Sequence, residues 1–137
     1  MRGTHVLYCD GASRGNPGLA SYGFSLLTPG GEVLVEGGRA IGVATNNVAE
    51  YRGLIAGLEA AIDAGIDDLE VRLDSLLLVK QISGEYRVKA PGLKPLQRQA
   101  VGLLARIGSA RLRHVPREQN TRADALANAA LDGEGLA

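Results

Sequence analysis

Apolar residues change their spacing along the chain, separating a first part with strand character from a second part in which helices and strands alternate. Residues 5–9 form a mostly apolar run that ends at Asp10, which predicts a buried strand entering a tight turn in the glycine-rich segment that follows. Segments 20–27 and 32–41 are also strand-like, with a Pro-Gly-Gly hairpin turn between them. We therefore expect three antiparallel strands, with Asp10 at the C-terminal end of the first.

Helical spacing begins after the third strand. In residues 46–64, Leu54 and Leu58 belong to one apolar helix face. Residues 69–73 alternate between apolar and charged side chains and end at Asp74, which predicts a fourth strand. The remaining predicted elements are a helix over 75–82, a loop over 84–91, a helix over 93–107, a strand over 110–115 and a last helix from about 121 to 131. This β-β-β-α-β-α-α-β-α order predicts an α/β fold with a mixed sheet, antiparallel first and parallel later.

The composition is that of a single globular domain and points to no partner. A length of 137 residues suits one hydrophobic core, and 45% apolar with 22% charged residues excludes a disordered tail, a coiled coil or a collagen-like repeat. Fifteen basic against fifteen acidic residues give no net charge, which argues weakly against a nucleic-acid partner. A single cysteine, Cys9, and the lack of an export signal or long apolar run favour a reduced, cytoplasmic protein without membrane attachment.

Four acidic residues stand at positions that turns and helix caps also explain. Asp10 precedes a glycine, as turn residues often do. Glu50 lies three residues after Asn47, the spacing of a capping box, and Asp74 is placed to cap the helix that follows it. Asp124 follows a threonine at the same capping-box spacing. For each residue taken singly, the ordinary structural explanation is favoured.

Taken together, the four acids indicate a metal site. Asp10 and Asp74 end predicted strands, where open α/β sheets place their ligand crevice. Glu50 continues the apolar face of its helix towards the sheet, and Asp124 shares a face with Leu131. Four inward carboxylates repel one another unless a cation neutralises them. With no histidine or cysteine cluster nearby, the oxygen ligands favour Mg²⁺ or Mn²⁺ over Zn²⁺.

Four segments carry a family resemblance. They are DGASRGNPG at 10–18, TNNVAE at 45–50, LDS at 73–75 and NTRADALA at 120–127. In this order and spacing they resemble the signature segments of type 1 ribonuclease H, and the match runs from about residue 5 to about residue 131. Segments 46–58 and 115–118 most resemble the compact branch found in archaea and in actinobacterial ribonuclease H domains fused to a phosphatase.

The resemblance implies a ribonuclease H-like fold, a five-stranded mixed sheet of three antiparallel and then two parallel strands with helices on both faces. It implies one domain over residues 1–137, with its core at about 5–131 and a short C-terminal tail. By the same resemblance, the catalytic carboxylates that hold two divalent ions, Mg²⁺ with Mn²⁺ as a substitute, are Asp10, Glu50, Asp74 and Asp124.

The implied reaction is endonucleolytic hydrolysis of the RNA strand of an RNA/DNA hybrid, leaving 5′-phosphate and 3′-hydroxyl ends. Two metal ions about 3.5–4 Å apart can activate the attacking water and stabilise the leaving oxygen of an in-line phosphoryl displacement. The family cuts without sequence specificity, which fits recognition of groove shape and 2′-hydroxyl groups rather than base edges.

Substrate contacts carry over from the same segments. Gly11 lets backbone amides approach a strand closely, and amide side chains such as Asn16 can both donate and accept hydrogen bonds in a minor groove. Asn46 and Asn47 precede Glu50 and are expected to do the same, although Asn46 is equally suited to cap the helix. Thr45 is a candidate donor to a DNA phosphate.

Two departures concern substrate binding. The chain has no room for the basic protrusion of the best-known bacterial members, and the remnant of that surface is Tyr86, Arg87 and Lys89, an aromatic face beside two cations. A solvated loop is the equally weighted alternative for this segment. Leu76 stands two residues after Asp74, where several relatives have a glutamine that contacts the groove.

A third departure is the loop before the last acid, where relatives carry a mobile histidine. His114 falls within the predicted last strand, so we interpret it as a structural residue. Arg117, in the shortened loop, is the better candidate to reach the scissile phosphate. A guanidinium cannot transfer protons at neutral pH, so its role would be electrostatic stabilisation of phosphoryl charge.

The leading hypothesis is therefore a monomeric, metal-dependent ribonuclease H. One alternative is a ribonuclease H-like module that binds nucleic acid without cutting it, which the presence of all four acids disfavours. The other is a structural domain that covers a partner polypeptide.

Overall fold

Nine helices and strands follow one another in the predicted order over the residues that the computed structural model describes, 3–136, with side chains to residue 133. Their bounds are β1 His5–Gly15, β2 Gly18–Leu27, β3 Val33–Ala44, α1 Asn46–Asp63, β4 Asp68–Leu73, α2 Leu76–Ser83, α3 Lys94–Arg106, β5 Ser109–His114 and α4 Thr121–Leu136, with a short 3-10 turn, Arg117–Gln119, before α4. Within the described residues, no helix is both long and apolar enough to cross a membrane.

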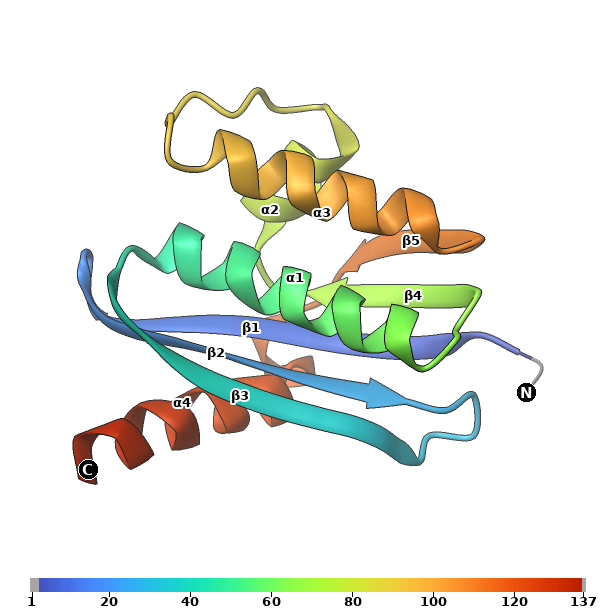
Figure 1. Ribbon diagram of the computed structural model, residues 1–137, viewed down its shortest axis with the longest axis horizontal. Coiled ribbons are helices and arrows are strands. Elements are labelled where there is room, and N and C mark those ends of the chain that lie inside the picture. The colour runs from blue at the N-terminus through green and yellow to red at the C-terminus, as the bar shows by residue number, and fades with distance from the viewer. Residues whose placement is uncertain (1–2, 137) are drawn as a thin grey trace.

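The five strands form one mixed sheet in the order β3-β2-β1-β4-β5. β1, β2 and β3 pair antiparallel, β4 pairs parallel with β1, and β5 pairs parallel with β4. α1 lies over one face of this sheet and α4 lies against the other (Figure 1). The predicted α/β fold, with three antiparallel strands, two parallel strands and helices on both faces, is confirmed.

The first strand differs from the prediction, because it does not turn at Asp10. β1 continues to Gly15 and pairs with β2 as far as Gly15 opposite Gly18, so the chain reverses only at Asn16–Pro17, whose peptide bond is cis. The small residues after Asp10 form ladder pairs instead of a turn. Parallel pairing with β4 nevertheless stops at Cys9 opposite Leu73, so Asp10 and Asp74 are still brought to the same level of the sheet.

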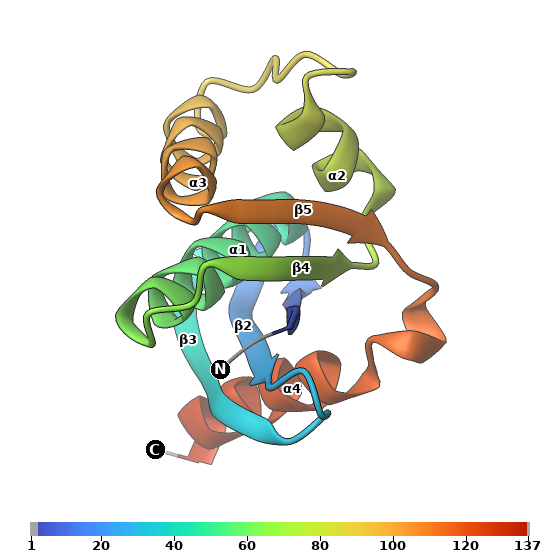
Figure 2. The same ribbon diagram turned by 90° about the vertical axis from the view of Figure 1, so that its right-hand side faces the viewer.

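The core lies between the sheet and α1, and α2 and α3 extend it at the β5 end. Leu7 and Val71 on the strands and Leu54 and Leu58 on α1 are fully buried in this cluster. Figure 2 shows α3 beside α1, with α2 and α3 grouped at the edge of the sheet formed by β5. The alternation of buried and partly exposed positions along β4 is what the sequence pattern predicts for a strand with one face on the core.

α4 packs against β2 with almost no space between the two backbones. A Cβ atom at Gly23 would lie 2.4 Å from the carbonyl oxygen of Ala123 and 2.6 Å from the amide nitrogen of Ala127. The Ser21 hydroxyl donates to the carbonyl of Ala127 at 2.5 Å. α4 continues to Leu136, so the predicted C-terminal tail after residue 131 is instead part of this helix.

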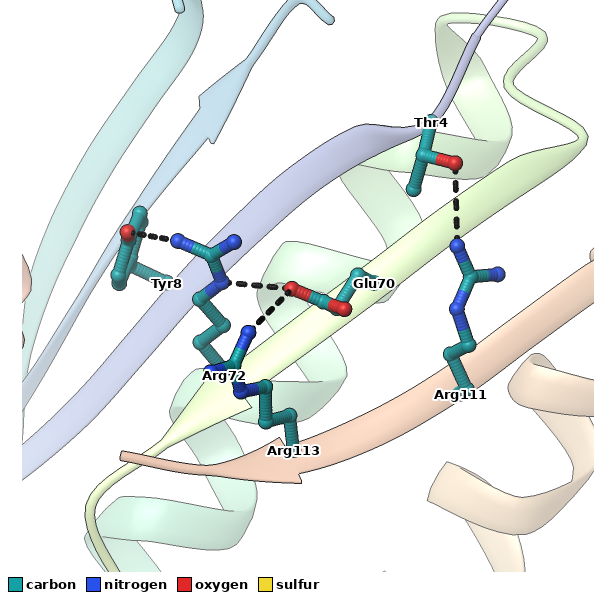
Figure 3. Close-up of polar contacts among 6 residues, drawn as sticks. All are labelled: Thr4, Tyr8, Glu70, Arg72, Arg111 and Arg113. Atoms are coloured by element: carbon teal, nitrogen blue, oxygen red, sulfur yellow. Dashed lines mark hydrogen bonds and ion pairs between the residues drawn. The ribbon is translucent and has the colours of Figure 1, made fainter.

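A polar network occupies β1, β4 and β5 on the face opposite the core cluster (Figure 3). Arg72 Nε donates to Glu70 at 2.7 Å, and its guanidinium also donates to the Tyr8 hydroxyl. Arg113 lies 3.9 Å from the same Glu70 carboxylate, and Arg111 donates to the Thr4 hydroxyl at 3.0 Å. These three arginines therefore have polar partners within the protein.

We expect the close approach of α4 to β2 to be sensitive to a single methyl group. Gly23→Ala should lower the free energy of unfolding by about 1–3 kcal/mol, because backbone atoms on α4 would have to move. Gly102→Ala is the matched control, since Gly102 is an exposed α3 position with nothing near its missing Cβ, and it should stabilise the protein by about 0.5–1 kcal/mol. Urea unfolding of both variants measures the difference. Equal effects would contradict the proposed packing constraint.

Candidate metal centre and cleft

Three of the four predicted carboxylates meet where β1, α1 and β4 come together. Ligand oxygens of Asp10, Glu50 and Asp74 all lie within 4.8 Å of one another. Asp10 is buried, with 7% of its surface exposed, whereas Glu50 and Asp74 are half-buried and reach solvent. The cluster is therefore open on one side and closed on the other.

Glu50 reaches this cluster because glycines allow α1 to lie directly on β1. A Cβ atom at Gly11 would be 2.4 Å from the Glu50 amide nitrogen, and one at Gly53 would be 2.9 Å from the Asp10 carbonyl oxygen. Any side chain at Gly11 would push the start of α1 away from the strand. Gly11 thus sets the distance between two of the carboxylates.

The caps of α1 and α2 are not the residues that the sequence suggested. The Thr45 hydroxyl accepts from the Val48 amide at 3.2 Å, so Thr45 caps α1, and the predicted capping box of Asn47 and Glu50 is wrong. Ser75 caps α2 by accepting from an amide at 3.1 Å, so Asp74 is not the cap either. With hydroxyl groups serving as caps, the carboxylates of Glu50 and Asp74 remain directed at the cluster.

The fourth carboxylate, Asp124, comes from the first turn of α4 and lines the same cleft as Asp10. Its position depends on Asn120, which the sequence analysis did not single out. The buried Asn120 side chain donates to the Cys9 carbonyl at 2.8 Å, and the backbone carbonyl of Asn120 accepts from the Asp124 amide at 3.2 Å. Asn120 therefore ties the start of α4 to the strand residue before Asp10. From sequence alone, an asparagine before a helix is indistinguishable from an ordinary cap.

The electrostatics of the cluster disfavour four free carboxylate charges. Burial raises the pKa of Asp10 to about 8, with further contributions from Asp74, Asp124 and Glu50. Burial also raises the pKa of Glu50 to about 7, where a hydrogen bond with Ser75 opposes the rise and Asp74 adds to it. Among side chains of residues 3–133, no lysine or arginine forms an ion pair with any of the four. An all-oxygen donor set without a protein counter-charge fits hard divalent cations such as Mg²⁺ and Mn²⁺.

A cleft of about 450 Å³ opens at the carboxylates. Three residues predicted to act on the substrate, Gly11, Asn46 and Arg117, line it, and Arg117 is exposed. The full lining is Asp10, Gly11, Ala12, Ser13, Arg14, Asn46, Glu50, Asp74, Arg117, Asp124, Asn128 and Leu131.

The other predicted contact residues lie around the rim. The Asn16 side chain accepts from the Asn46 amide at 3.2 Å and so joins the β1–β2 turn to the start of α1. Asn47 is half-buried in the first turn of α1. Leu76 is 47% exposed at the start of α2. His114 is the last residue of β5, as predicted for a strand residue.

Tyr86 and Lys89 lie away from the carboxylates, on the segment between α2 and α3. Tyr86 lines a second groove of about 650 Å³ whose cations are Arg87, Lys94 and Arg98. The Lys80 ammonium is 5.0 Å from the centre of the Tyr86 ring. Lys89 is exposed on the same segment but does not line this groove. The structure thus presents an aromatic and basic surface here, separate from the metal centre.

Comparisons with known proteins identify relatives of this chain. The family model described as "Reverse transcriptase-like" matches residues 8–130. Ribonuclease HI of Halobacterium salinarum is 52% identical over 125 residues, covering 91% of this chain and 63% of that protein. Bifunctional protein Rv2228c of Mycobacterium tuberculosis is 50% identical over 128 residues, covering 93% of this chain and 35% of that protein. The chain thus spans less than two thirds of the length of either curated relative.

Solved structures agree with the sequence matches. The crystal structure of RNase H1 from Halobacterium salinarum has a TM-score of 0.92 at 50% identity, covering 96% of this chain and 99% of that one. LC11-RNase H1, solved in complex with an RNA/DNA hybrid, has a TM-score of 0.89 at 40% identity, covering 97% of this chain and 99% of that one. Since the family model spans most of the chain and these relatives share its fold and about half of its residues, the chain belongs to the type 1 ribonuclease H family.

Proposed function

We propose that this chain is an endoribonuclease that hydrolyses the RNA strand of RNA/DNA hybrids with the help of divalent cations, leaving 5′-phosphate and 3′-hydroxyl ends. The observation that carries the proposal is the convergence of carboxylates from β1, α1, β4 and α4 on one open cleft. The related LC11-RNase H1, solved with an RNA/DNA hybrid, supports the choice of substrate. We propose that residues 1–137 act as one ribonuclease H domain.

The site would hold two Mg²⁺ ions, or Mn²⁺ in their place, through the carboxylates of Asp10, Glu50, Asp74 and Asp124. Bound there, divalent ions supply Lewis acidity for an in-line displacement at phosphorus. Asp10, the most buried of the three clustered carboxylates, anchors the metal site from the sheet, while Glu50 and Asp74 complete it from its solvent side. The exposed Arg117 guanidinium faces the same cleft and would stabilise charge on the phosphoryl oxygens.

The rim residues would position the hybrid over this centre. Asn46 lines the cleft, and its backbone is held by Asn16, so the two act together with Asn47 on the minor groove. The Thr45 hydroxyl accepts the α1 capping bond and keeps its own proton free to donate to a phosphate. Gly11 lines the cleft, where its backbone amide would approach a strand closely.

The groove at residues 84–98 would take a second part of the hybrid. Tyr86 offers an aromatic face, and Arg87, Lys94 and Arg98 supply positive charge around it. Lys89, exposed on the same segment, would reach the backbone of the bound duplex. Because this surface is small, affinity should depend on the metal centre as well as on the groove.

Cleavage of a labelled RNA/DNA hybrid tests the proposal directly. We expect Mg²⁺- or Mn²⁺-dependent cleavage of the RNA strand, and Asp10→Asn should lower its rate by roughly 100-fold or more while hybrid binding remains. Asp63→Asn, at an exposed position of α1 outside the cleft, is the matched control and should cut normally. Metal-dependent binding without cleavage by the unaltered protein would instead favour a nucleic-acid-binding module.

Metal binding should also appear as pH-dependent stability. Asp10 and Glu50 hold protons more tightly in the folded protein than in the unfolded chain, where their pKa values are about 4. Without metal, the free energy of unfolding should therefore fall as pH rises from about 4 towards 7 and 8. Mg²⁺ should raise Tm more at pH 9 than at pH 5.5, and Asp10→Asn should flatten the metal-free profile. A Tm gain from Mg²⁺ that does not depend on pH would contradict this view of the cluster.

Arg117→Ala tests the electrostatic role of the shortened loop. We expect kcat to fall by roughly 10- to 1,000-fold, with Tm unchanged because Arg117 is exposed. Arg106→Ala removes another exposed cation, one outside the cleft, and should leave kcat unaffected. An unchanged rate in Arg117→Ala would remove this residue from the mechanism.

A further inference from the structure

Arg14 lies in the same cleft as the carboxylates but has no role in the proposed reaction so far. It is on β1, four residues beyond Asp10, and lines the cleft together with Asn128 and Leu131 of α4. Its guanidinium donates to the carboxylate of Asp132, also on α4. The cleft therefore has a second charged position, formed by the same two elements that hold Asp10 and Asp124.

The spacing between the two charged positions is about the same along β1 as along α4. Arg14 follows Asp10 by four residues on a strand, or about 13 Å at 3.3 Å per residue. Asp132 follows Asp124 by eight residues on a helix, or about 12 Å at 1.5 Å per residue. Figure 1 shows that α4 extends along the sheet to the side of the molecule where β1 ends. The cleft is thus a trough between β1 and α4, with acids at one end and an arginine at the other.

A nucleic-acid strand has the repeating charge that such a trough would bind. If one phosphate of the strand lies at the carboxylates, the strand leaving them along the trough brings another phosphate near Arg14 a few nucleotides away. Arginine binds phosphate oxygens through two parallel hydrogen bonds, which suits it to this contact.

The ion pair with Asp132 is weak enough to exchange. The Arg14 side chain is 54% exposed and that of Asp132 is 61% exposed, and ion pairs between such exposed groups contribute little to stability. A second arginine–carboxylate pair between α4 and the sheet, Arg122 with Glu36 of β3, provides a comparison, since neither residue lines the cleft and Glu36 is only 19% exposed. Only the Arg14 pair faces the proposed path of the substrate.

We propose that Arg14 binds a backbone phosphate of the strand being cut, a few nucleotides from the scissile bond, and that Asp132 holds the Arg14 guanidinium over the trough and competes with that phosphate. The inference rests on the proposed function. Asp132 then acts as a positioning residue with two opposed effects, because it orders the guanidinium and must also release it when the substrate binds.

Hybrid binding measured by fluorescence anisotropy in the cleavage-deficient Asp10→Asn protein tests this. Arg14→Ala should raise Kd roughly tenfold and lower the slope of log K against log salt concentration by about 1, since one phosphate contact is lost. Asp132→Asn should lower Kd roughly two- to fivefold when Arg14 is present, and should have no effect when it is combined with Arg14→Ala.

The controls separate direct competition from general charge and folding effects. Glu36→Gln makes the same change in net charge within the other α4 pair, and it should alter Kd less than Asp132→Asn does. Arg14→Lys should keep the salt slope but regain only part of the affinity, because an ammonium cannot make two parallel bonds. Tm measured for each variant checks that the proteins are folded.

Single neutral methylphosphonate groups placed along the RNA strand, and in separate hybrids along the DNA strand, locate the contact. At one position away from the scissile bond, the neutral group should weaken binding to the Asp10→Asn protein. The same group should not weaken binding further when Arg14→Ala is added to that protein. An unchanged Kd in Arg14→Ala, an equal effect of Asp132→Asn with and without Arg14, or a matching position found only on the DNA strand would overturn the inference. No hybrid binding by the parent protein would instead contradict the proposed function itself.

Discussion

Backbone lies against backbone at Gly11, where a Cβ atom would be 2.4 Å from the amide nitrogen of Glu50, and again at Gly23, where it would be 2.4 Å from the carbonyl of Ala123. These two contacts hold α1 and α4 against opposite faces of the sheet, and each helix carries a carboxylate of the site in its first turns. Because these two glycines have no side chain, they set how close the acids on different elements can lie. The packing energy of the core is what opposes the mutual repulsion of the acids.

Acidic and basic residues occupy different parts of the molecule. The carboxylates of the metal centre have no basic partners among the described side chains, whereas Arg72, Arg111 and Arg113 are bound within the network on β1, β4 and β5 (Figure 3). The net charge of zero thus combines an acidic centre, ion-paired arginines and other cations that are exposed to solvent. Read as an average, it argues weakly against a nucleic-acid partner, and under the proposed function this inference would fail because charge is segregated in space.

Two groups of exposed cations would contact the hybrid in the proposed function. One group, Arg14 and Arg117, lies in the cleft, and the other lies in the groove beside Tyr86. In the proposed function, the cleft acts on the strand being cut and the groove holds the duplex nearby. Neither surface is large, so the domain would depend on the fit of both and on its metal centre instead of on a general excess of positive charge.

The order of the elements, the class of sheet and the four candidate acids could be predicted from the sequence, because they depend on local periodicity and on residues within short segments. It also identified the family through those segments. Other features depend on tertiary contacts, which periodicity cannot express. Asp10 lies within a long strand, because the small residues after it pair with β2 instead of turning.

Contacts between distant residues account for the rest. Whether an acid serves as a cap depends on which side chain reaches the first free amide, and Thr45 and Ser75 take that role. The Asn120 side chain donates a hydrogen bond to the carbonyl of Cys9, 111 residues away. Arg14 forms an ion pair with Asp132, 118 residues away. Such pairs leave no periodic signal in a single sequence, because their spacing is set by how the sheet and helices fold together.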